Sequence, residues 1–444
     1  MTKVGFISLG CSKNQVDTEV MLKSLADAGY TIVSDETEAD IVVINTCGFI
    51  ESAKRESIDN ILDVAWLKEN RSLRGIVVTG CMAERYREQI FSEMPEVDAL
   101  LGVGSLAHIV DAVRAVDSGE KYSSFEDKEK SPLGGERILT TPAYSAYLKI
   151  AEGCDNRCTY CAIPLIRGRL RSRPIEDLVA EAVALGKNGA KELNIIAQDT
   201  SRYGLDLYGR YRLTDLVREI CRATDIPWIR LLYCYPDKIT DELIAEMRDN
   251  PRLLPYMDIP IQHISDRILT AMNRHGNGRL VRETVEKLRR EVPGITLRTT
   301  AMVGFPGETR EDFEELCNYL REARFDRFGA FTYSPEEDTP AASFPNQIDE
   351  QEKQDRYDIL MQTQLPISEE LQRAKVGSDV TVLCEGYDRV ASTHFGRSAA
   401  DAPDVDGKVY FSSKKRVAPG KFVRVHLTDA LDYDLIGEAV EVLD

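Results

Sequence analysis

The chain has 444 residues, which is enough for about three domains of ordinary size. Its 74 acidic residues exceed its 56 Lys and Arg residues, so the formal net charge is −18. This balance argues against general binding of nucleic acid, because phosphate binding depends on clustered Lys and Arg. It suits a basic protein partner, although a solvated acidic surface is the simpler alternative.

We expect a cytoplasmic protein. No signal peptide opens the chain, and no apolar run approaches the length of a membrane span. Ten cysteines without secretory context indicate a reducing compartment and metal ligation rather than disulfides.

The first part of the chain repeats one pattern three times, a short β-branched run that ends at a cysteine. The runs are 4–10, 40–46 and 75–80, and the cysteines that follow are Cys11, Cys47 and Cys81. Such runs, separated by helix-like segments, are typical of parallel strands in an α/β sheet, whose sites lie at the carboxyl ends of strands. We predict an N-terminal parallel α/β domain at 1–120 with a three-cysteine cluster site; loop thiols without metal are the alternative.

Residues 121–142 are predicted to be a linker, because the chain there is polar and mixed in charge, with Ser, Gly and Pro throughout. Just before it, residues 102–107 formally match the dinucleotide fingerprint G-x-G-x-x-A. The match follows only a weak strand, 97–101, and lies late in its domain, so we interpret it as an ordinary glycine turn.

A second group of three cysteines follows the next apolar run, in the spacing C-x3-C-x2-C: Cys154, Cys158 and Cys161. Three thiolates in one short loop can hold three corners of an iron–sulfur cluster and leave one iron open to a small molecule. Zinc sites pair their ligands as two short clips, and no second clip follows here. Buried thiols are a further alternative, but the polar residues between these cysteines are poor core material.

Six candidate strands alternate with amphipathic stretches between residues 143 and 370. The strands are expected at 147–151, 192–198, 228–235, 256–262, 297–303 and 328–333. Six such units fall short of the eight of a full barrel, so we predict an incomplete (β/α)6 barrel with its site at the C-terminal ends of the strands.

Several residues at these strand ends are candidates for cofactor binding. Gln198 is the last residue of the second predicted strand, and the fifth strand runs into a loop in which Gly304 and Gly307 would let backbone approach a flat ligand. Glu308 could serve the ligand or be a first-turn helix acid. His263, after the fourth strand, is more often a packed group than a general base.

An alternating run of arginines follows the second cysteine group, at 167, 169, 171 and 173. Such a run is usually a solvated face, but beside a cofactor with a carboxylate it can bind that group or shield a cluster. Arg173 is the candidate cofactor contact from this run. The other four cysteines have no partners at ligand spacing and are predicted to be core thiols: Cys221, Cys234, Cys317 and Cys384.

Residues 375–444 show short alternating strands, at 379–385, 408–411, 422–427 and 435–442, punctuated by glycines. The pattern predicts a small five-stranded antiparallel β-barrel of the OB kind. An RNA-binding barrel should be basic, whereas this segment holds nine Lys or Arg against twelve Asp or Glu, a net charge of −3. We expect it to dock a basic protein through acids such as Asp404 and Asp406.

Both cysteine groups, the incomplete barrel and the terminal barrel together resemble the methylthiotransferase family of radical S-adenosylmethionine (SAM) enzymes, across essentially the whole chain. The C-x3-C-x2-C spacing, with the aromatic Tyr160 before its third cysteine, is similar to the superfamily motif. In that superfamily the open iron binds SAM, and the reduced cluster cleaves it to a radical that abstracts hydrogen from carbon. Residues 9–14, 198–204 and 404–410 resemble the branch that methylthiolates an aspartate of the small-subunit ribosomal protein S-twelve.

The resemblance implies an N-terminal cluster domain, a radical SAM domain at 143–370 and a TRAM domain at 375–444. It implies SAM and two 4Fe–4S clusters as cofactors, one cluster on each cysteine group, with the N-terminal cluster holding the sulfur. The implied product is β-methylthio-aspartate, the implied electron donor is a protein such as flavodoxin or ferredoxin, and no direct tRNA substrate is expected. Two alternatives stay open: a tRNA methylthiotransferase acting on a modified adenosine, and a non-catalytic two-cluster electron carrier.

Overall fold

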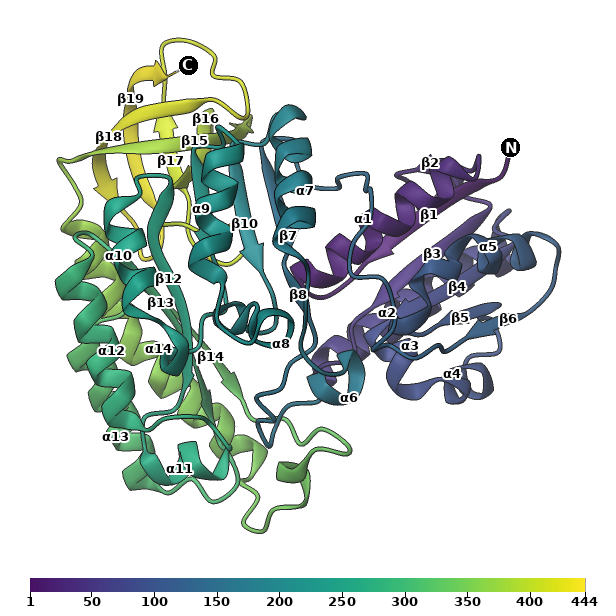
Figure 1. The fold of residues 1–444 in the computed structure, drawn as a ribbon, viewed down its shortest axis with the longest axis horizontal. Helices are drawn as coiled ribbons and strands as arrows, with labels where there is room; N and C mark the ends of the chain where they lie inside the picture. The colour runs from purple at the N-terminus through teal and green to yellow at the C-terminus, as the bar shows by residue number, and fades with distance from the viewer. Residues whose placement is uncertain (444) are drawn as a thin grey trace.

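The computed structural model describes residues 1–443 as three packed parts. In Figure 1 a parallel sheet with its helices lies on the right, a larger parallel sheet with its helices lies on the left, and a small β-barrel, drawn in yellow, sits above the larger sheet. No helix in this described range is both long and apolar enough to cross a membrane. The predicted α/β class is confirmed, while the domain bounds 1–120, 143–370 and 375–444 remain predictions.

The N-terminal sheet has six parallel strands in the order β2-β1-β3-β4-β5-β6. Its central strands are apolar and fully buried, because helices cover both faces of the sheet. Helices α1 (Ser12–Asp27) and α5 (Ile109–Asp117) cover one face, and α2 (Glu51–Asn70), α3 (Cys81–Tyr86) and α4 (Glu88–Glu93) cover the other. The strands are β1 (Lys3–Ser8), β2 (Thr31–Val33), β3 (Ile41–Thr46), β4 (Gly75–Gly80), β5 (Ala99–Leu101) and β6 (Tyr122–Ser124).

Strand β6 lies within the stretch 121–142 that the sequence predicts to be a linker. Its residues pair with β5 and complete the edge of the first sheet. Polar residues such as Ser123 and Ser124 carry no apolar pattern, so the edge strand escapes detection from sequence.

The central sheet consists of six parallel strands in the order β14-β13-β12-β11-β10-β7, so strands that follow one another in the chain are neighbours. All six predicted strands are confirmed, with ends shifted by a few residues: β7 (Ser145–Lys149), β10 (Glu192–Ile196), β11 (Trp228–Leu231), β12 (Leu253–Gln262), β13 (Thr296–Val303) and β14 (Arg327–Thr332).

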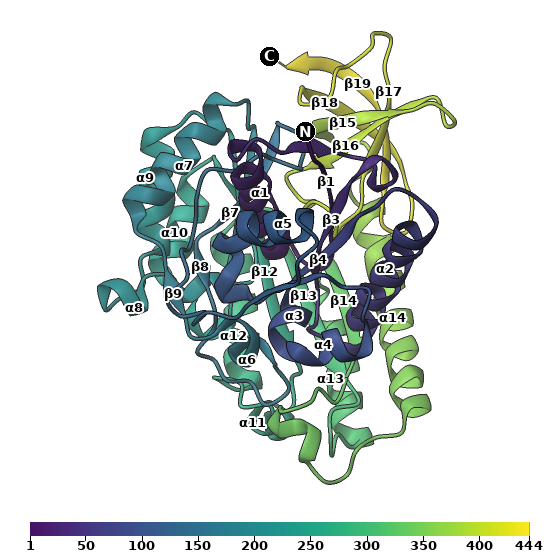
Figure 2. The same ribbon diagram turned by 90° about the vertical axis from the view of Figure 1, so that its right-hand side faces the viewer.

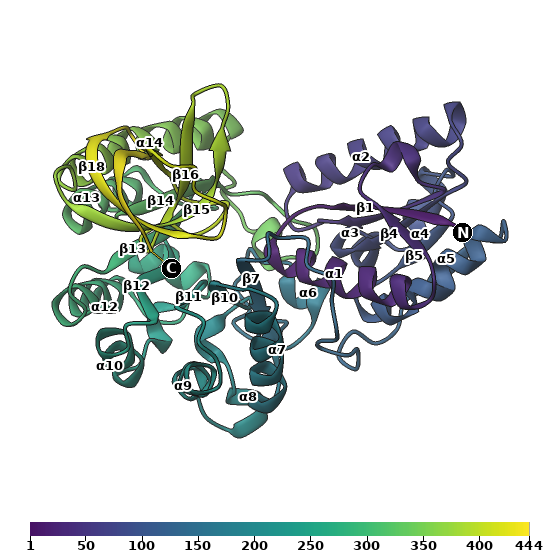
Figure 3. The same cartoon turned by 90° about the horizontal axis from the view of Figure 1, so that it is seen from above.

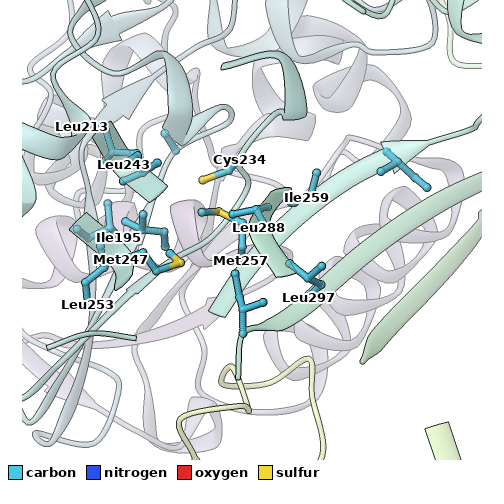
Figure 4. Packing of buried hydrophobic residues seen from close by; sticks show 14 of the residues in the cluster. Ile195, Leu213, Cys234, Leu243, Met247, Leu253, Met257, Ile259, Leu288 and Leu297 are labelled. Carbon is cyan, nitrogen blue, oxygen red and sulfur yellow. The ribbon is translucent and has the colours of Figure 1, made fainter. Parts of the chain in front are cut away.

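Helices cover the outer face of this sheet. Figure 4 shows the apolar contact between strand residues such as Met257 and Leu297 and helix residues such as Met247 and Leu288. The helices are α7 (Ile175–Lys187), α9 (Leu213–Ala223), α10 (Asp241–Asp249), α12 (Gly278–Glu291), α13 (Arg310–Ala323) and α14 (Glu350–Arg373). The sheet and its helices form the incomplete barrel that the sequence predicts.

The N-terminal domain closes the open side of this barrel. The two edge strands, β7 and β14, do not pair with each other. Helix α1 lies beside β7, as Figure 3 shows from above. Beyond β14, Glu336 receives the guanidinium of Arg85 from α3 at 2.7 Å and the ammonium of Lys54 from α2 at 3.7 Å. Figure 2, which looks from this side, shows the N-terminal elements in front of the central strands.

The terminal part is a closed five-stranded barrel, as predicted, in the order β15-β16-β17-β19-β18. Four of the five pairings are antiparallel, and β17 pairs with β19 in parallel. Four of these strands are expected from the sequence; β16 is not, because its Ser- and Gly-containing segment lacks a clear apolar alternation. The strands are β15 (Asp379–Asp388), β16 (Thr393–Ser398), β17 (Val409–Ser412), β18 (Phe422–Ala430) and β19 (Leu435–Leu443).

This barrel is fixed to the ends at which the central strands begin. Glu192, the first residue of β10, is fully buried and pairs with Arg397 of β16 at 2.6 Å and with Arg230 of β11 at 3.1 Å. Burial raises the pKa of Glu192, but the two guanidinium groups outweigh burial and hold it at about 2. A second buried pair joins Asp401 to Arg327 of β14.

The contact between the terminal barrel and the central strands corrects the expectation that Asp406 docks a partner. The side chain of Asp406 is only 2% exposed, and its Oδ2 accepts hydrogen bonds from the Tyr256 hydroxyl at 2.6 Å and the Ala402 N–H at 2.8 Å. The carboxylate of Asp406 is therefore engaged in hydrogen bonds within the chain, so Asp406 cannot form part of a docking surface. Asp404 remains exposed while accepting a hydrogen bond from the Tyr147 hydroxyl at 3.0 Å.

Glu192→Gln should destabilise the protein strongly, because it leaves two buried arginines sharing one neutral amide. Breaking a buried ion pair by removing one partner costs about 3–5 kcal/mol, measured as the free energy of unfolding in urea. Glu441→Gln is the matched control: it also removes a carboxylate from an arginine, Arg424 at 2.8 Å, but this pair is about half exposed. The control should cost less than about 1 kcal/mol, and equal losses in the two variants would contradict the assignment.

Candidate functional site

Three cysteines of the N-terminal domain meet at one edge of its sheet. Strands β1, β3 and β4 are direct neighbours, and each ends just before one of them: Cys11, Cys47 and Cys81. The approach is close, since a Cβ on Gly10 would lie 2.7 Å from the Cβ of Cys47, and Gly10 has a φ of +86° that L side chains rarely adopt. The predicted convergence of this first triad, Cys11, Cys47 and Cys81, at the strand ends is present in the fold.

The surroundings of two cysteines of the first triad, Cys47 and Cys81, disfavour bare thiolates. Burial, and then the charges of Cys81 and Cys11, raise the pKa of Cys47 to about 12. Burial also raises the pKa of Cys81. The protein atoms around Cys11 desolvate it, which acts in the same direction although the residue is partly exposed at the surface, but the charges of Lys13 and Arg167 outweigh this and leave the pKa of that thiol below its ordinary value. Three thiolates here need added positive charge, which a bound metal cluster would supply.

The second triad, Cys154, Cys158 and Cys161, occupies a loop between two short elements of the central domain. Strand β8 (Ala151–Glu152) pairs with β9 (Arg171–Ser172), and helix α6 (Ile163–Arg167) follows the cysteines. Burial raises the pKa of Cys154 to about 12, and burial followed by the charge of Cys158 raises that of Cys161. The Sγ of Cys158 lies 3.8 Å from the Tyr235 hydroxyl.

Within residues 1–443, no three His, Cys, Asp or Glu side chains are grouped around a point where a single metal ion could bind. An iron–sulfur cluster is instead a body of several atoms held by cysteines at its corners. The thiols of each triad, grouped in one loop or at one sheet edge, suit such a ligand by their chemistry.

Gln198 and Tyr160, two predicted cofactor contacts, lie near the second triad; their role in binding a cofactor stays a prediction. The Nε2 of Gln198 donates to Glu152 at 2.7 Å, while its buried Oε1 has no hydrogen-bond partner in the described residues. Tyr160 packs against an apolar cluster that includes Phe305 and Tyr333, so the cysteine loop and the loop that follows β13 share this cluster. An unsatisfied buried acceptor beside an aromatic wall fits a polar ligand with a flat apolar part.

The loop after β13 is built by Glu308. Its Oε2 accepts the N–H groups of Gly304 and Phe305 at 2.8 and 3.2 Å, and its Oε1 accepts from Arg356 at 2.9 Å. Helix α13 begins only at Arg310, after the N-cap Thr309, so the first-turn helix interpretation of Glu308 is wrong. Gly304 and Gly307 have φ values of +75° and +79°, so glycine suits both positions of this loop.

Arg173 lies away from both triads. Its guanidinium pairs with Glu181 of α7 at 2.6 Å and donates to the carbonyl of Lys149 at 2.9 Å. Arg173, a candidate for cofactor binding from the sequence, is therefore engaged in an internal ion pair instead. Arg169, in the same run, is 67% exposed and lies 3.4 Å from Asp155.

Arg167 is the member of the arginine run that reaches the site. Its side chain is 2% exposed and donates to Asp17 at 2.7 Å and Glu152 at 3.1 Å. Lys149 pairs with the same two carboxylates. These four residues, Asp17, Lys149, Glu152 and Arg167, form a buried charge group that joins α1 of the first domain to the cysteine loop of the second.

The buried charge group also connects the two triads. Arg167 lies 3.4 Å from the Sγ of Cys81 and donates to Asn14 at 2.6 Å, while Glu152 accepts from Gln198. The sequence singles out the arginine run but not which member reaches the first triad, because alternation alone does not distinguish positions 167 and 173, and both are buried. Arg274, whose guanidinium lies 4.0 Å from the Tyr235 ring centroid, is a further buried cation near the second triad without a sequence signal.

The remaining candidates are packed residues. His263 is buried, burial lowers its pKa to about 3, and its Nδ1 accepts from the Ser265 N–H at 3.0 Å. It is therefore neutral at physiological pH, in agreement with a packed group. Of the predicted core thiols, Cys234, Cys317 and Cys384 are buried and Cys221 is half-buried.

Arg167→Met should destabilise the contact between the domains. It removes one cation from the buried charge group and leaves Asp17 and Glu152 with Lys149 alone, at a cost of about 3–5 kcal/mol. Arg169→Met, two residues away in the same run, removes an exposed arginine and should cost less than about 1 kcal/mol. Urea unfolding of both variants measures the difference, and a loss as small in Arg167→Met as in the control would contradict the role of the buried charge group.

Comparison with protein families divides the chain into the same three parts. Residues 3–102 match the uncharacterized protein family UPF0004, residues 148–320 match the radical SAM superfamily, and residues 376–440 match the TRAM domain. Among solved structures, the radical SAM methyltransferase TsrM from Kitasatospora setae aligns with a TM-score of 0.55 at 16% identity, covering 77% of this chain and 75% of that one. This similarity supports the fold.

Curated relatives align from end to end. A protein of Desulforamulus reducens is 48% identical over 99% of this chain and 100% of its own length, and one of Geobacter sulfurreducens is 47% identical over 99% and 98%. Both are named ribosomal protein uS12 methylthiotransferase RimO. The chain therefore belongs to the RimO methylthiotransferase family and is a radical SAM methylthiotransferase that uses SAM and 4Fe–4S clusters.

Proposed function

We propose that this enzyme methylthiolates the β-carbon of an aspartate in the small-subunit ribosomal protein uS12. The observation that carries the proposal is the pair of three-cysteine sites connected by one buried charge group, in a chain whose full-length relatives are named for this reaction. A non-catalytic electron carrier would not need the ligand-sized loops beside the second triad.

Each triad is assigned one 4Fe–4S cluster. Cys154, Cys158 and Cys161 would hold the cluster that acts on SAM, because Tyr160, the free Oε1 of Gln198 and the loop Gly304–Gly307 lie on that side. Cys11, Cys47 and Cys81 would hold the cluster associated with sulfur. A β C–H bond of a carboxylate side chain is not activated, and the cofactors supply the one-electron chemistry that it requires.

The polypeptide contributes position and enclosure. Arg167 and Lys149 fix the first domain against the barrel, so the two triads keep a fixed position relative to each other. The pairs of Arg85 and Lys54 with Glu336 hold the other edge of the first domain over the open side of the barrel. An enclosed site excludes water from reactive species formed within it.

The partners follow from charge and chemistry. Ribosomal proteins that neutralise RNA are basic, and this chain carries −18 overall and −3 in its terminal barrel. The terminal barrel, with Asp404 at its exposed end, is the proposed docking surface. A flavodoxin or ferredoxin is the proposed electron donor, and the cytoplasm is the proposed location because the ribosomes are there.

The tRNA alternative predicts a different product. Reconstituted enzyme, supplied with SAM and a reductant, should add one methylthio group to purified uS12, located on an aspartate by mass spectrometry of its peptides. The same reaction with bulk tRNA should leave its nucleosides unchanged. Efficient methylthiolation of tRNA with none of uS12 would contradict the proposed substrate. Binding of uS12 should also weaken as salt rises, since complementary charge is screened beyond roughly 8 Å at physiological ionic strength.

A further inference from the structure

A cavity of about 580 Å³ lies where the three parts of the chain meet. Cys11 contributes from the first domain, Tyr233, Asp258 and Arg298 from the central barrel, and Asp404 from the terminal barrel. Cys11 is the thiol of the first triad that is exposed. The cavity thus leads from the exposed rim of the terminal barrel to the proposed sulfur-carrying site.

Lys13 is a largely buried cation beside this cavity; its charge acts on the neighbouring Cys11 thiol, and no carboxylate of residues 1–443 pairs with it. Only 6% of the residue is exposed, and its neighbours Cys11 and Ser12 both line the cavity. Its Nζ lies 3.5 Å from the centroid of the Tyr233 ring, and that ring lines the cavity too. Within residues 1–443 its ammonium meets this ring and no carboxylate. A largely buried charge is normally compensated by an anion. With Cys11 held as a cluster ligand, this ammonium can accept a carboxylate that enters the cavity.

Tyr233, whose ring lies against Lys13, is itself held in an unusual backbone conformation. Tyr233 has a φ of +62°, which a bulky residue rarely adopts. Its N–H donates to Asp258 Oδ2 at 3.1 Å, and Asp258 Oδ1 accepts from Arg298 at 3.0 Å. The fold therefore maintains a strained residue where its ring meets Lys13, which is typical of functional sites.

The other cation of the cavity is already neutralised. Arg298 pairs with Asp258 at 3.0 Å and lies 3.6 Å from Asp406. Lys13 is consequently the cation available to an incoming anion. A carboxylate is the group that the proposed reaction brings next to the reacting carbon.

We propose that Lys13 binds the side-chain carboxylate of the target aspartate and so places its β-carbon beside the Cys11, Cys47 and Cys81 site. This inference rests on the proposed function and adds the residue that selects the substrate. Tyr233 and Asp258 act as positioning residues, since they hold the ring against which Lys13 lies. SAM also carries a carboxylate, so the test must separate the two sources of this group.

The test measures binding of purified uS12 to the reconstituted holoenzyme by calorimetry. Two forms of uS12 are compared, the natural protein and a variant with Asn at the aspartate that gains the methylthio group. Wild-type enzyme should bind the Asp form at least about tenfold more tightly, because a charge-assisted hydrogen bond is lost with Asn. Equal binding of the two forms by wild-type enzyme would overturn the role of Lys13 whatever the variants do.

Lys13→Met keeps the length and the contact with the Tyr233 ring but removes the charge. It should bring the Asp-to-Asn affinity ratio close to one, whereas Lys13→Arg should retain a preference for Asp. Lys23→Met, on the same helix but paired with Asp27, is the matched control and should keep the wild-type ratio. If Lys13→Met holds less iron than wild type, the uncharged Lys13→Gln gives the same readout.

Two results would overturn the inference while leaving the proposed function intact. One is an unchanged Asp-to-Asn ratio in a Lys13→Met enzyme that holds its iron. The other is weakened SAM binding in Lys13→Met with that ratio unchanged, which would assign the carboxylate to SAM. Failure of wild-type enzyme both to bind and to modify uS12 would instead overturn the proposed function itself.

Discussion

The structure depends on a buried group of four charges between its first two domains. Asp17 comes from α1 of the first domain, whereas Lys149, Glu152 and Arg167 flank the cysteine loop of the second. Two anions and two cations compensate one another, which a dry interface requires. Because Arg167 also contacts Cys81, the group that holds the domains together also orders the edge of a cysteine site.

The barrel becomes an enclosed site only through its neighbours. Six strands leave an open side, and the first domain covers it through α1 at one edge and through Arg85 at the other. The terminal barrel covers the ends at which the central strands begin, where Glu192 forms ion pairs with two arginines. Some acidic residues of the terminal barrel, such as Asp406, are engaged in contacts within the chain. The barrel therefore offers fewer acids to a partner than its composition implies.

The sequence predicts those features that have a local pattern. Strand runs, cysteine spacing and glycine-rich loops are periodic or contiguous, so six central strands and the meeting of Cys11, Cys47 and Cys81 could be inferred from it. It does not identify pairings between residues distant in the chain. The contact of Arg167 rather than Arg173 with Cys81, the use of Glu308 to build a loop and the burial of the Asp406 side chain all depend on tertiary contacts that have no local signal. The polar edge strand β6 and strand β16 have no signal in the sequence because they lack apolar alternation.

The most direct test of two separate cysteine sites compares two variants of the reconstituted enzyme. One replaces Cys154, Cys158 and Cys161 with Ala, and the other carries Cys47→Ala; iron content, deoxyadenosine and methylthiolated uS12 are measured for each. Wild-type enzyme should hold about eight irons. The triple variant should keep the other cluster and form no deoxyadenosine, whereas Cys47→Ala should still cleave SAM but form no methylthiolated product. A normal rate of product formation by Cys47→Ala, or about four irons in fully reconstituted wild-type enzyme, would contradict the account.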